Sequence, residues 1–120
     1  LQQTDPHLPY ESIAEAILGK NYELSLVFIG DQRSQTLNRT YRNHDQPASV
    51  LSFPLDKEAG EIYINIPYAG RRARRQPATL SQTVAYLFIH GLLHLNGHDH
   101  GGTMDKREKE YCAQFGIPYP

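Results

Sequence analysis

The stretch Phe88-Ile-His-Gly-Leu-Leu-His-Leu-Asn-Gly-His-Asp-His100 predicts the end of a buried helix that runs into a turn. His90 and His94 stand four residues apart. On a helix this spacing gives roughly 6 Å of rise, so the two imidazoles lean to one side. Gly97 follows three residues after His94, where a residue with positive φ can end the helix. The stretch therefore predicts a pair of metal ligands at the end of a central helix.

A further histidine beyond the turn would complete an open metal site. The chain can swing either His98 or His100 back as the third ligand. Three neutral imidazoles suit zinc or another borderline divalent metal, and a fourth position then stays open for water or substrate. We therefore predict one bound Zn²⁺ ion at a site where catalysis is possible.

The spacing H-x-x-x-H-x-x-G-x-x-H is shared with the metzincin proteases, but their general base is absent. Those enzymes carry a Glu after the first His, and it takes a proton from zinc-bound water. Gly91 stands at that position, so peptide hydrolysis by this mechanism is not expected. Because glycine costs a helix roughly 1 kcal/mol relative to alanine, Gly91 is expected to mark a close approach of another backbone or of substrate.

Two blocks of sequence resemble the YbeY family, which comprises bacterial metal-dependent endoribonucleases implicated in rRNA maturation. The block His90-Gly-Leu-Leu-His-Leu-Asn-Gly-His-Asp-His100 is similar to the family signature H-G-x-L-H-L-x-G-Y-D-H. Upstream, Leu37-Asn-Arg-Thr-Tyr-Arg-Asn-His-Asp-Gln-Pro-Ala-Ser-Val-Leu-Ser-Phe-Pro54 is similar to L-N-x-x-Y-R-x-x-D-x-P-T-D-V-L-S-F-P. Both blocks are long and occur in the family's order.

The resemblance implies roles for four residues of the catalytic centre. It makes His100 the third metal ligand beside His90 and His94, and His90 is also assigned to the catalytic group. It places Arg42 in the active cleft. A guanidinium there can bind phosphate oxygens bidentately and offset the negative charge that phosphodiester cleavage builds on them.

Three more residues are candidates for supporting the site or for touching substrate. Asp99 can orient the neighbouring His100 through its other ring nitrogen. His98 stands where the family usually has Tyr, and it can bind phosphate when protonated or simply pack. Ser52 belongs to the second block and is assigned to the same supporting group.

The sequence also departs from the family pattern. Ala48-Ser49 replaces the usual Thr-Asp pair, and Glu61 stands where an Asp is common, whereas Met104 and Glu108 repeat the family's M-x-x-x-E. These departures concern contacts around the metal ligands and leave the ligands themselves in place.

The composition predicts one soluble domain over residues 1–120. The formal net charge is −1, and no apolar run approaches the roughly 20 residues of a membrane span. No signal peptide is visible. The lone Cys112 excludes an internal disulfide and fits a reducing compartment, so a cytoplasmic location without membrane contact is expected.

Four arginines gather in one segment: Arg71, Arg72, Arg74 and Arg75. They can follow an RNA backbone through salt-sensitive phosphate contacts. They can equally form a solvated helix face, because the net charge is near zero and no aromatic stacking motif accompanies them. Both interpretations stay open.

Hydrophobic periodicity predicts an α+β or loosely α/β fold, with a small mixed sheet of three to four strands around a central metal-bearing helix and several flanking helices. Strands are expected at residues 24–29, 50–53 and 61–66, the first buried on both faces and the second ended by Pro54. Asp31 is expected to cap a short helix whose inner edge is formed by Leu37 and Tyr41. Thr79 and Gln82 predict a capping box that begins the central helix.

A final helix is expected over residues 103–115. Its apolar side chains should point inward and its charges outward. The inward set is Met104, Tyr111, Cys112 and Phe115.

The family resemblance implies a zinc-dependent, single-strand-specific endoribonuclease that matures the 3′ end of small-subunit rRNA and acts in ribosome quality control. The small ribosomal subunit and its proteins would be partners, and DNA is not expected as a substrate. The metal would polarise a phosphoryl oxygen or acidify bound water, and no general base is identified. The alternative is a metal-stabilised ribosome-assembly or RNA-binding factor with little or no catalytic activity.

Overall fold

The computed structural model describes residues 7–98 and 101–120, and every structural statement below refers to them. The helices and strands follow in the order α1 (Tyr10–Leu18), β1 (Glu23–Ile29), α2 (Asp31–Arg42), β2 (Val50–Asp56), β3 (Ala59–Asn65), α3 (Ile66–Arg74), α4 (Leu80–Leu95) and α5 (Gly102–Gln114). This arrangement confirms the predicted α+β fold with a long central helix.

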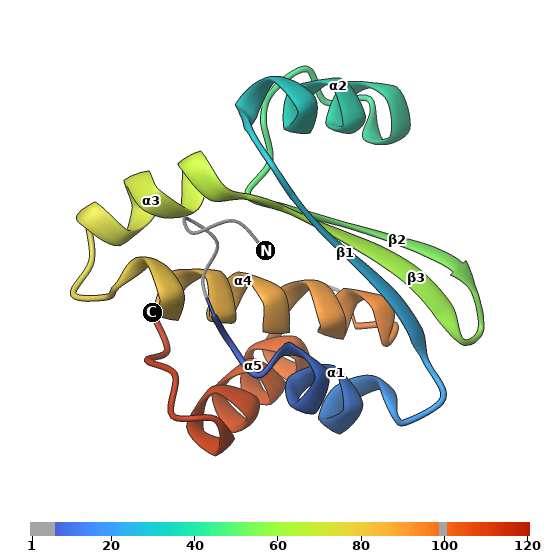
Figure 1. The fold of residues 1–120 in the computed structure, drawn as a ribbon, viewed down its shortest axis with the longest axis vertical. Helices are drawn as coiled ribbons and strands as arrows, with labels where there is room; N and C mark the ends of the chain where they lie inside the picture. The colour runs from blue at the N-terminus through green and yellow to red at the C-terminus, as the bar shows by residue number, and fades with distance from the viewer. Residues whose placement is uncertain (1–6, 99–100) are drawn as a thin grey trace.

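The three strands form one mixed sheet in the order β1-β3-β2. Strand β1 runs parallel to β3, whereas β2 runs antiparallel to β3 and joins it through a tight turn. In Figure 1 α4 runs along one face of the sheet, and α1 and α5 lie on the far side of α4. Helix α2 lies on the other side of the sheet from α4. The helix that carries the histidines is therefore enclosed between the sheet and two other helices.

The core lies between β3 and α4. Alternate residues of β3 face the helix, as the two-residue period of a strand requires, and Ile62 and Ile64 are fully buried there. Phe88 of α4, Ile13 of α1 and Met104 of α5 meet them in the same cluster. A helix that is apolar nearly all round has to be covered in this way, and the cover fixes the position of α4.

The predicted start of α4 is confirmed. The Thr79 hydroxyl accepts a hydrogen bond from the Gln82 backbone N–H at 3.1 Å, and the Gln82 side chain accepts one from the Thr79 N–H at 2.9 Å. These reciprocal bonds satisfy two donors that the first turn of a helix leaves open. The helix then runs for 16 residues to the histidines.

Two predictions about α2 are wrong. Gly30 is its N-cap, with no side-chain cap, because the Asp31 carboxylate instead accepts hydrogen bonds from Arg71 and Asn65. Tyr41 is 67% exposed and does not line the inner edge. The inner face is polar, because its buried residues are Ser34 and Asn38.

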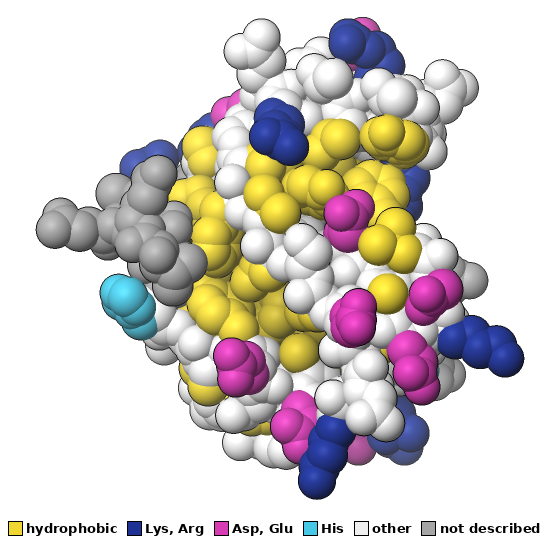
Figure 2. Space-filling view, turned by 45° about the vertical axis from the view of Figure 1, so that its right-hand side comes forward, with side chains coloured by type: hydrophobic (Ala, Val, Ile, Leu, Met, Phe, Trp, Pro, Cys, Tyr) yellow, Lys and Arg dark blue, Asp and Glu magenta, His cyan; other side chains and the backbone are white. Residues whose placement is uncertain are grey.

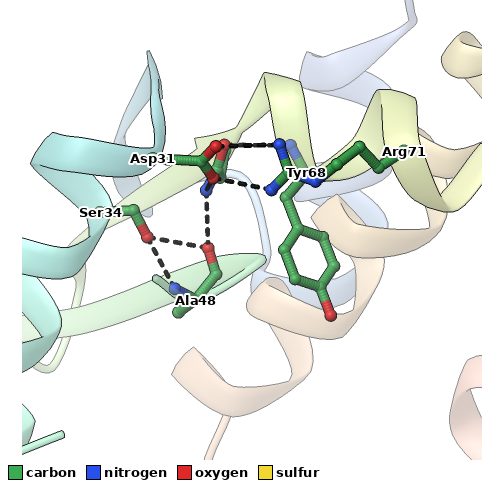
Figure 3. Close-up of polar contacts among 6 residues, drawn as sticks. Asp31, Ser34, Ala48, Tyr68 and Arg71 are labelled. Atoms are coloured by element: carbon green, nitrogen blue, oxygen red, sulfur yellow. Dashed lines mark hydrogen bonds and ion pairs between the residues drawn. The ribbon is translucent and has the colours of Figure 1, made fainter. Parts of the chain in front are cut away.

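That polar face holds the loop that leads into β2. Ser34 and Ala48 exchange two hydrogen bonds of 2.8 Å through the Ser34 hydroxyl. The fully buried Asn65 donates to Asp31 at 2.8 Å and to the Ala48 carbonyl at 3.2 Å. Figure 3 shows these groups converging, with Arg71 facing Asp31. Because the contacts use the backbone of Ala48, its departure from the family pattern leaves them intact.

Two predictions about the strands also need correction. Strand β2 does not end at Pro54 but continues to Asp56, with a register shift between the two residues. Strand β1 is an edge strand, and only its last residue, Ile29, is buried. The run of apolar residues therefore marks a partly covered strand, because the sheet has no fourth strand within the described residues to cover its edge.

Apolar side chains also gather on the surface. Figure 2 shows them in the middle of one face, with Asp and Glu side chains mainly over its lower half and right side and Lys and Arg side chains around its rim. Tyr41 and Leu55 are the most exposed large apolar residues, at 67% and 64%.

None of the helices within residues 7–98 and 101–120 has the length and apolar character needed to cross a membrane.

Candidate metal centre

The two helical histidines converge as their spacing predicts. The Nε2 atoms of His90 and His94 lie 3.2 Å apart, and the ring planes are inclined by 78°. The His90 side chain is only 19% exposed. Two imidazole nitrogens that face one point at this separation fit the donor set of a zinc ion.

A buried carboxylate fixes the orientation of the first ring. Glu108 of α5 is hydrogen-bonded through Oε2 to His90 Nδ1, and its side chain is 3% exposed. A carboxylate accepts hydrogen bonds, so Nδ1 of the ring donates, and in the neutral ring Nε2 is then the nitrogen whose lone pair faces His94. This is the arrangement in which a carboxylate orients a metal-binding histidine from behind.

The second oxygen of this carboxylate is also engaged. The Tyr86 hydroxyl donates to Glu108 Oε1 at 3.4 Å. Burial, followed by the nearby charge of Glu108, raises the pKa of Tyr86 to about 12. The phenol therefore stays protonated at physiological pH and can act as a donor.

Glu108 is the residue of the site that the sequence reasoning missed. The prediction that all charges of the last helix point outward is wrong at this position, because Glu108 is buried with Met104 and Cys112. These three residues follow one another at intervals of four, so they share a helix face. That spacing, together with the M-x-x-x-E likeness, was the available signal.

The chain turns after α4 as predicted. Gly97 has a φ of +90°. Its N–H bonds to the His94 carbonyl at 3.1 Å, and the His98 N–H bonds to the Leu93 carbonyl at 3.0 Å. This pair of bonds is the Schellman motif, which requires a left-handed residue and therefore favours glycine.

The third ligand was expected from His98 or His100. Within residues 7–98 and 101–120 no three His, Cys, Asp or Glu side chains are placed to hold one ion. His98 therefore does not join the His90 and His94 pair in this structure. Asp99 and His100 lie outside the described residues, so their predicted roles remain predictions.

Arg42 is connected to the histidine helix through β2. Its Nη2 donates to the Ser52 carbonyl at 2.6 Å, and its guanidinium lies 5.4 Å from the centre of the Phe53 ring. The buried Ser52 hydroxyl in turn donates to the Gly91 carbonyl at 2.9 Å. Ser52 thus links Arg42 to the residue next to His90.

Gly91 explains how closely β2 approaches α4. A Cβ atom at this position would lie 3.0 Å from Ser52 Oγ and 3.2 Å from Val50 Cγ2. The expected approach of a backbone or substrate is therefore replaced by side chains of β2. A glutamate of metzincin type has no room at this position without moving the strand away from the helix.

The four arginines of the second half have different surroundings. Arg71 forms a bidentate ion pair with Asp31 at 2.8 and 2.9 Å, and this bond lowers the pKa of Asp31. Arg72 lies 5.0 Å from the centre of the Tyr86 ring. Arg74 and Arg75 are exposed at the end of α3. Only Arg72 is thus in direct contact with the face that leads to His90.

The lone cysteine does not add to the donor set. Cys112 is 1% exposed. Burial, followed by the charge of Glu108, raises its pKa to about 11. It therefore stays a thiol, whereas metal binding needs a thiolate.

Sequence comparison relates this chain to one family of known proteins. The family model of endoribonuclease YbeY matches residues 7–116. The endoribonuclease YbeY of a Sulfurovum species is 38% identical over 121 residues, covering 90% of this chain and 81% of the relative. That of Halalkalibacterium halodurans is 36% identical over 124 residues, covering 90% and 75%.

A solved structure shows the same fold. The solution structure of TM1509 from Thermotoga maritima superimposes with a TM-score of 0.63 at 28% identity, covering 88% of this chain and 75% of that one. The chain combines this α+β fold with a histidine pair that is supported by a buried carboxylate. The chain belongs to the YbeY endoribonuclease family.

Proposed function

We propose that this chain is a zinc-dependent endoribonuclease that cleaves single-stranded RNA. The family supplies RNA as the substrate class. The observation that carries the proposal is the pair of Nε2 atoms 3.2 Å apart on His90 and His94, with the buried Glu108 behind the first ring. Burying a carboxylate is costly unless it is paired, and its position behind a histidine suits metal binding.

His90, His94 and His100 would hold one ion. When bound, a zinc ion supplies Lewis-acid polarisation of a phosphoryl oxygen and increases the acidity of water. Glu108 would hold a proton of His90 on Nδ1, which makes Nε2 of the neutral ring the nitrogen that can bind the ion. Because both Glu108 oxygens are engaged by His90 and Tyr86, Glu108 is a positioning residue and not the base that activates water.

Arg42 would bind the scissile phosphate. Phosphodiester cleavage adds negative charge to the non-bridging oxygens, and a guanidinium remains charged throughout. The side chain is exposed at the end of α2 and rests against the backbone of Ser52. It can therefore turn from this carbonyl to a phosphate without disturbing the core.

The biological substrate proposed is the precursor 3′ end of small-subunit rRNA, with the small ribosomal subunit and its proteins as cytoplasmic partners. This part of the proposal rests on the resemblance to the family. It predicts that extracts lacking the protein accumulate the extended rRNA, and that wild type but not His94→Ala restores the mature end.

The test is cleavage of a labelled single-stranded RNA by rigorously purified protein. Wild type should cut, a chelator should stop cutting, and added zinc should restore it. His94→Ala should not cut and Arg42→Ala should cut far more slowly, while Arg39→Ala, which changes another exposed arginine of α2, should behave as wild type.

Equal residual cutting by wild type, His94→Ala and Arg42→Ala would identify a contaminating nuclease. Zinc binding and RNA binding without cleavage would then favour the alternative, a ribosome-assembly factor whose metal only stabilises the fold. The chelator and zinc steps separate these outcomes, because a contaminant does not depend on the histidines of this chain.

A further inference from the structure

A hollow lies one helical turn before the histidines. It has a volume of about 260 Å³ and is formed by α3, the first half of α4 and the last residues of the chain. Drug-sized ligands occupy pockets of roughly 300 Å³ or more, so this hollow suits a smaller group. Its walls include Arg72, Gln76, Pro77, Tyr86, Pro118 and Tyr119.

The walls present planar groups. The Arg72 guanidinium lies 5.0 Å from the Tyr86 ring centre. The Tyr119 ring meets Tyr86 edge-on at 6.0 Å, and Tyr119 remains 36% exposed. Aromatic rings and guanidinium planes are the side chains on which proteins stack unpaired RNA bases.

A basic hollow adjoins the first one. It has a volume of about 290 Å³, and Tyr68, Arg71, Arg72, Arg75 and Gln76 line it. The two hollows share Arg72 and Gln76. The aromatic hollow suits the base of a nucleotide, and the basic hollow suits its phosphate. The two hollows meet at Arg72, so one nucleotide can occupy both.

Tyr86, which lines the aromatic hollow, is also a neighbour of His90 in the candidate metal centre. Tyr86 and His90 stand four residues apart on α4, so they share one helix face. Their ring centres are 6.2 Å apart. A strand that places a base at Tyr119 and a phosphate at Arg72 can therefore continue along this face to the histidines.

We propose that these two hollows form a nucleotide-binding subsite for single-stranded RNA, with the base against Tyr119 and Tyr86 and its phosphate on Arg72 and Arg75. The inference rests on the proposed function for the identity of the ligand. Stacking does not distinguish between bases, because every base has a π-face. The subsite thus holds an unpaired strand beside the cleavage centre without reading its sequence.

The test measures binding separately from cleavage. A short, labelled RNA serves as the probe, with chelator present to stop cleavage, and one nucleotide at a time is made abasic. The proteins compared are wild type, Tyr119→Ala and Tyr119→Phe. Cleavage of the unmodified RNA is measured in parallel.

In wild type, one abasic position should weaken binding about tenfold, which is the usual scale of a single base stack. Tyr119→Ala should bind the intact probe about tenfold more weakly and lose nothing further at that abasic position. Tyr119→Phe keeps the ring and should behave as wild type. If the abasic probe loses as much affinity with Tyr119→Ala as with wild type, the subsite is wrong.

Arg72 and Arg74 provide the matched charge test. Arg72→Ala should lower the salt dependence of binding by about one phosphate contact. Arg74→Ala, which removes an exposed arginine from the same helix but from neither hollow, should not. If both changes lowered the salt dependence equally, the arginines would act only as a general basic surface. The proposed subsite would then be wrong.

The two proposals can fail separately. If the wild type cleaves RNA but Tyr119 shows no coupling to any base, the proposed nuclease activity stands and the proposed subsite is wrong. If the wild type shows this coupling but does not cleave RNA, the subsite stands and the proposed nuclease activity is wrong.

Discussion

Two carboxylates among the described residues, Glu108 and Asp31, lie in different surroundings. Glu108 has a side chain that is 3% exposed and bonds a histidine and a tyrosine. Asp31 has a side chain that is 40% exposed and bonds an arginine and an asparagine. Each joins two helices, Glu108 linking α5 to α4 and Asp31 linking α2 to α3, yet of the two only Asp31 has a permanent positive charge as its partner.

The difference in burial indicates different roles for the two carboxylates, one in metal binding and one in folding. An exposed carboxylate paired with arginine holds elements together at little cost, because water still solvates both charges. A buried carboxylate against an imidazole gains less and loses its hydration. Glu108 is therefore expected to serve the metal, whereas Asp31 serves the arrangement of α2, α3 and the loop between α2 and β2.

The largest effect is expected from the metal ligands. His94→Ala should lose zinc binding, and RNA cleavage should fall to background, because two remaining imidazoles cannot hold a catalytic ion tightly. His98→Ala is the matched control and should retain both properties. Calorimetric titration with zinc and an RNA cleavage assay check this. If His98→Ala lost zinc binding and His100→Ala kept it, the third ligand would be His98 and not His100.

The second effect concerns the phosphate. Arg42→Ala should reduce the cleavage rate roughly 10²- to 10³-fold, the scale for removing one charge-stabilising donor, while the zinc affinity stays unchanged. Arg42→Lys should recover only part of the rate, because lysine lacks the bidentate geometry. A fall in zinc affinity with either change would show that Arg42 acts on the metal site and not on substrate.

The third change tests the comparison itself. Glu108→Gln should weaken zinc binding roughly 10- to 100-fold, as removal of a carboxylate behind a metal-binding histidine does. Asp31→Asn should leave the zinc affinity as in wild type. Calorimetric titration of both variants measures the contrast. The unfolding midpoint of metal-free Glu108→Gln should not fall below that of wild type, and a clear fall would assign Glu108 to folding.

The smallest effect is expected at the exposed ion pair. Arg71→Ala should lower the unfolding midpoint slightly at neutral pH. Because the bond to Arg71 lowers the pKa of Asp31 from its ordinary value of 3.8, its contribution is fully present above that value. It should be lost as the pH falls through the lower folded-state pKa. Urea unfolding of wild type and variant should therefore differ at pH 7 and converge in acid.

Local signals in the sequence predicted the local features of the site. The spacing of His90 and His94, the glycine at Gly97 and the capping box at Thr79 each depend on a few neighbouring residues. The contacts of Glu108 and of Asp31 cross 18 and 40 residues respectively. No periodicity within one helix could have paired them.

The incorrect prediction for α2 has a similar cause. Periodicity analysis searches for apolar side chains on the inner face of a helix, so it selected Tyr41. The buried face instead carries Ser34 and Asn38, because it binds the backbone of a loop and not a hydrophobic core. A polar inner face of this kind cannot be recognised from the helix sequence alone, because the position of the loop that it binds must be known.

The most direct test of the metal centre is a crystal structure of the zinc-loaded protein, with the ion located by anomalous scattering. We expect one zinc with His90 and His94 nitrogens at about 2.0–2.1 Å, a third nitrogen from His100, no protein atom at the fourth position, and Glu108 on the far side of the His90 ring. Zinc bound away from these rings, or the two rings turned apart in the loaded protein, would contradict the account.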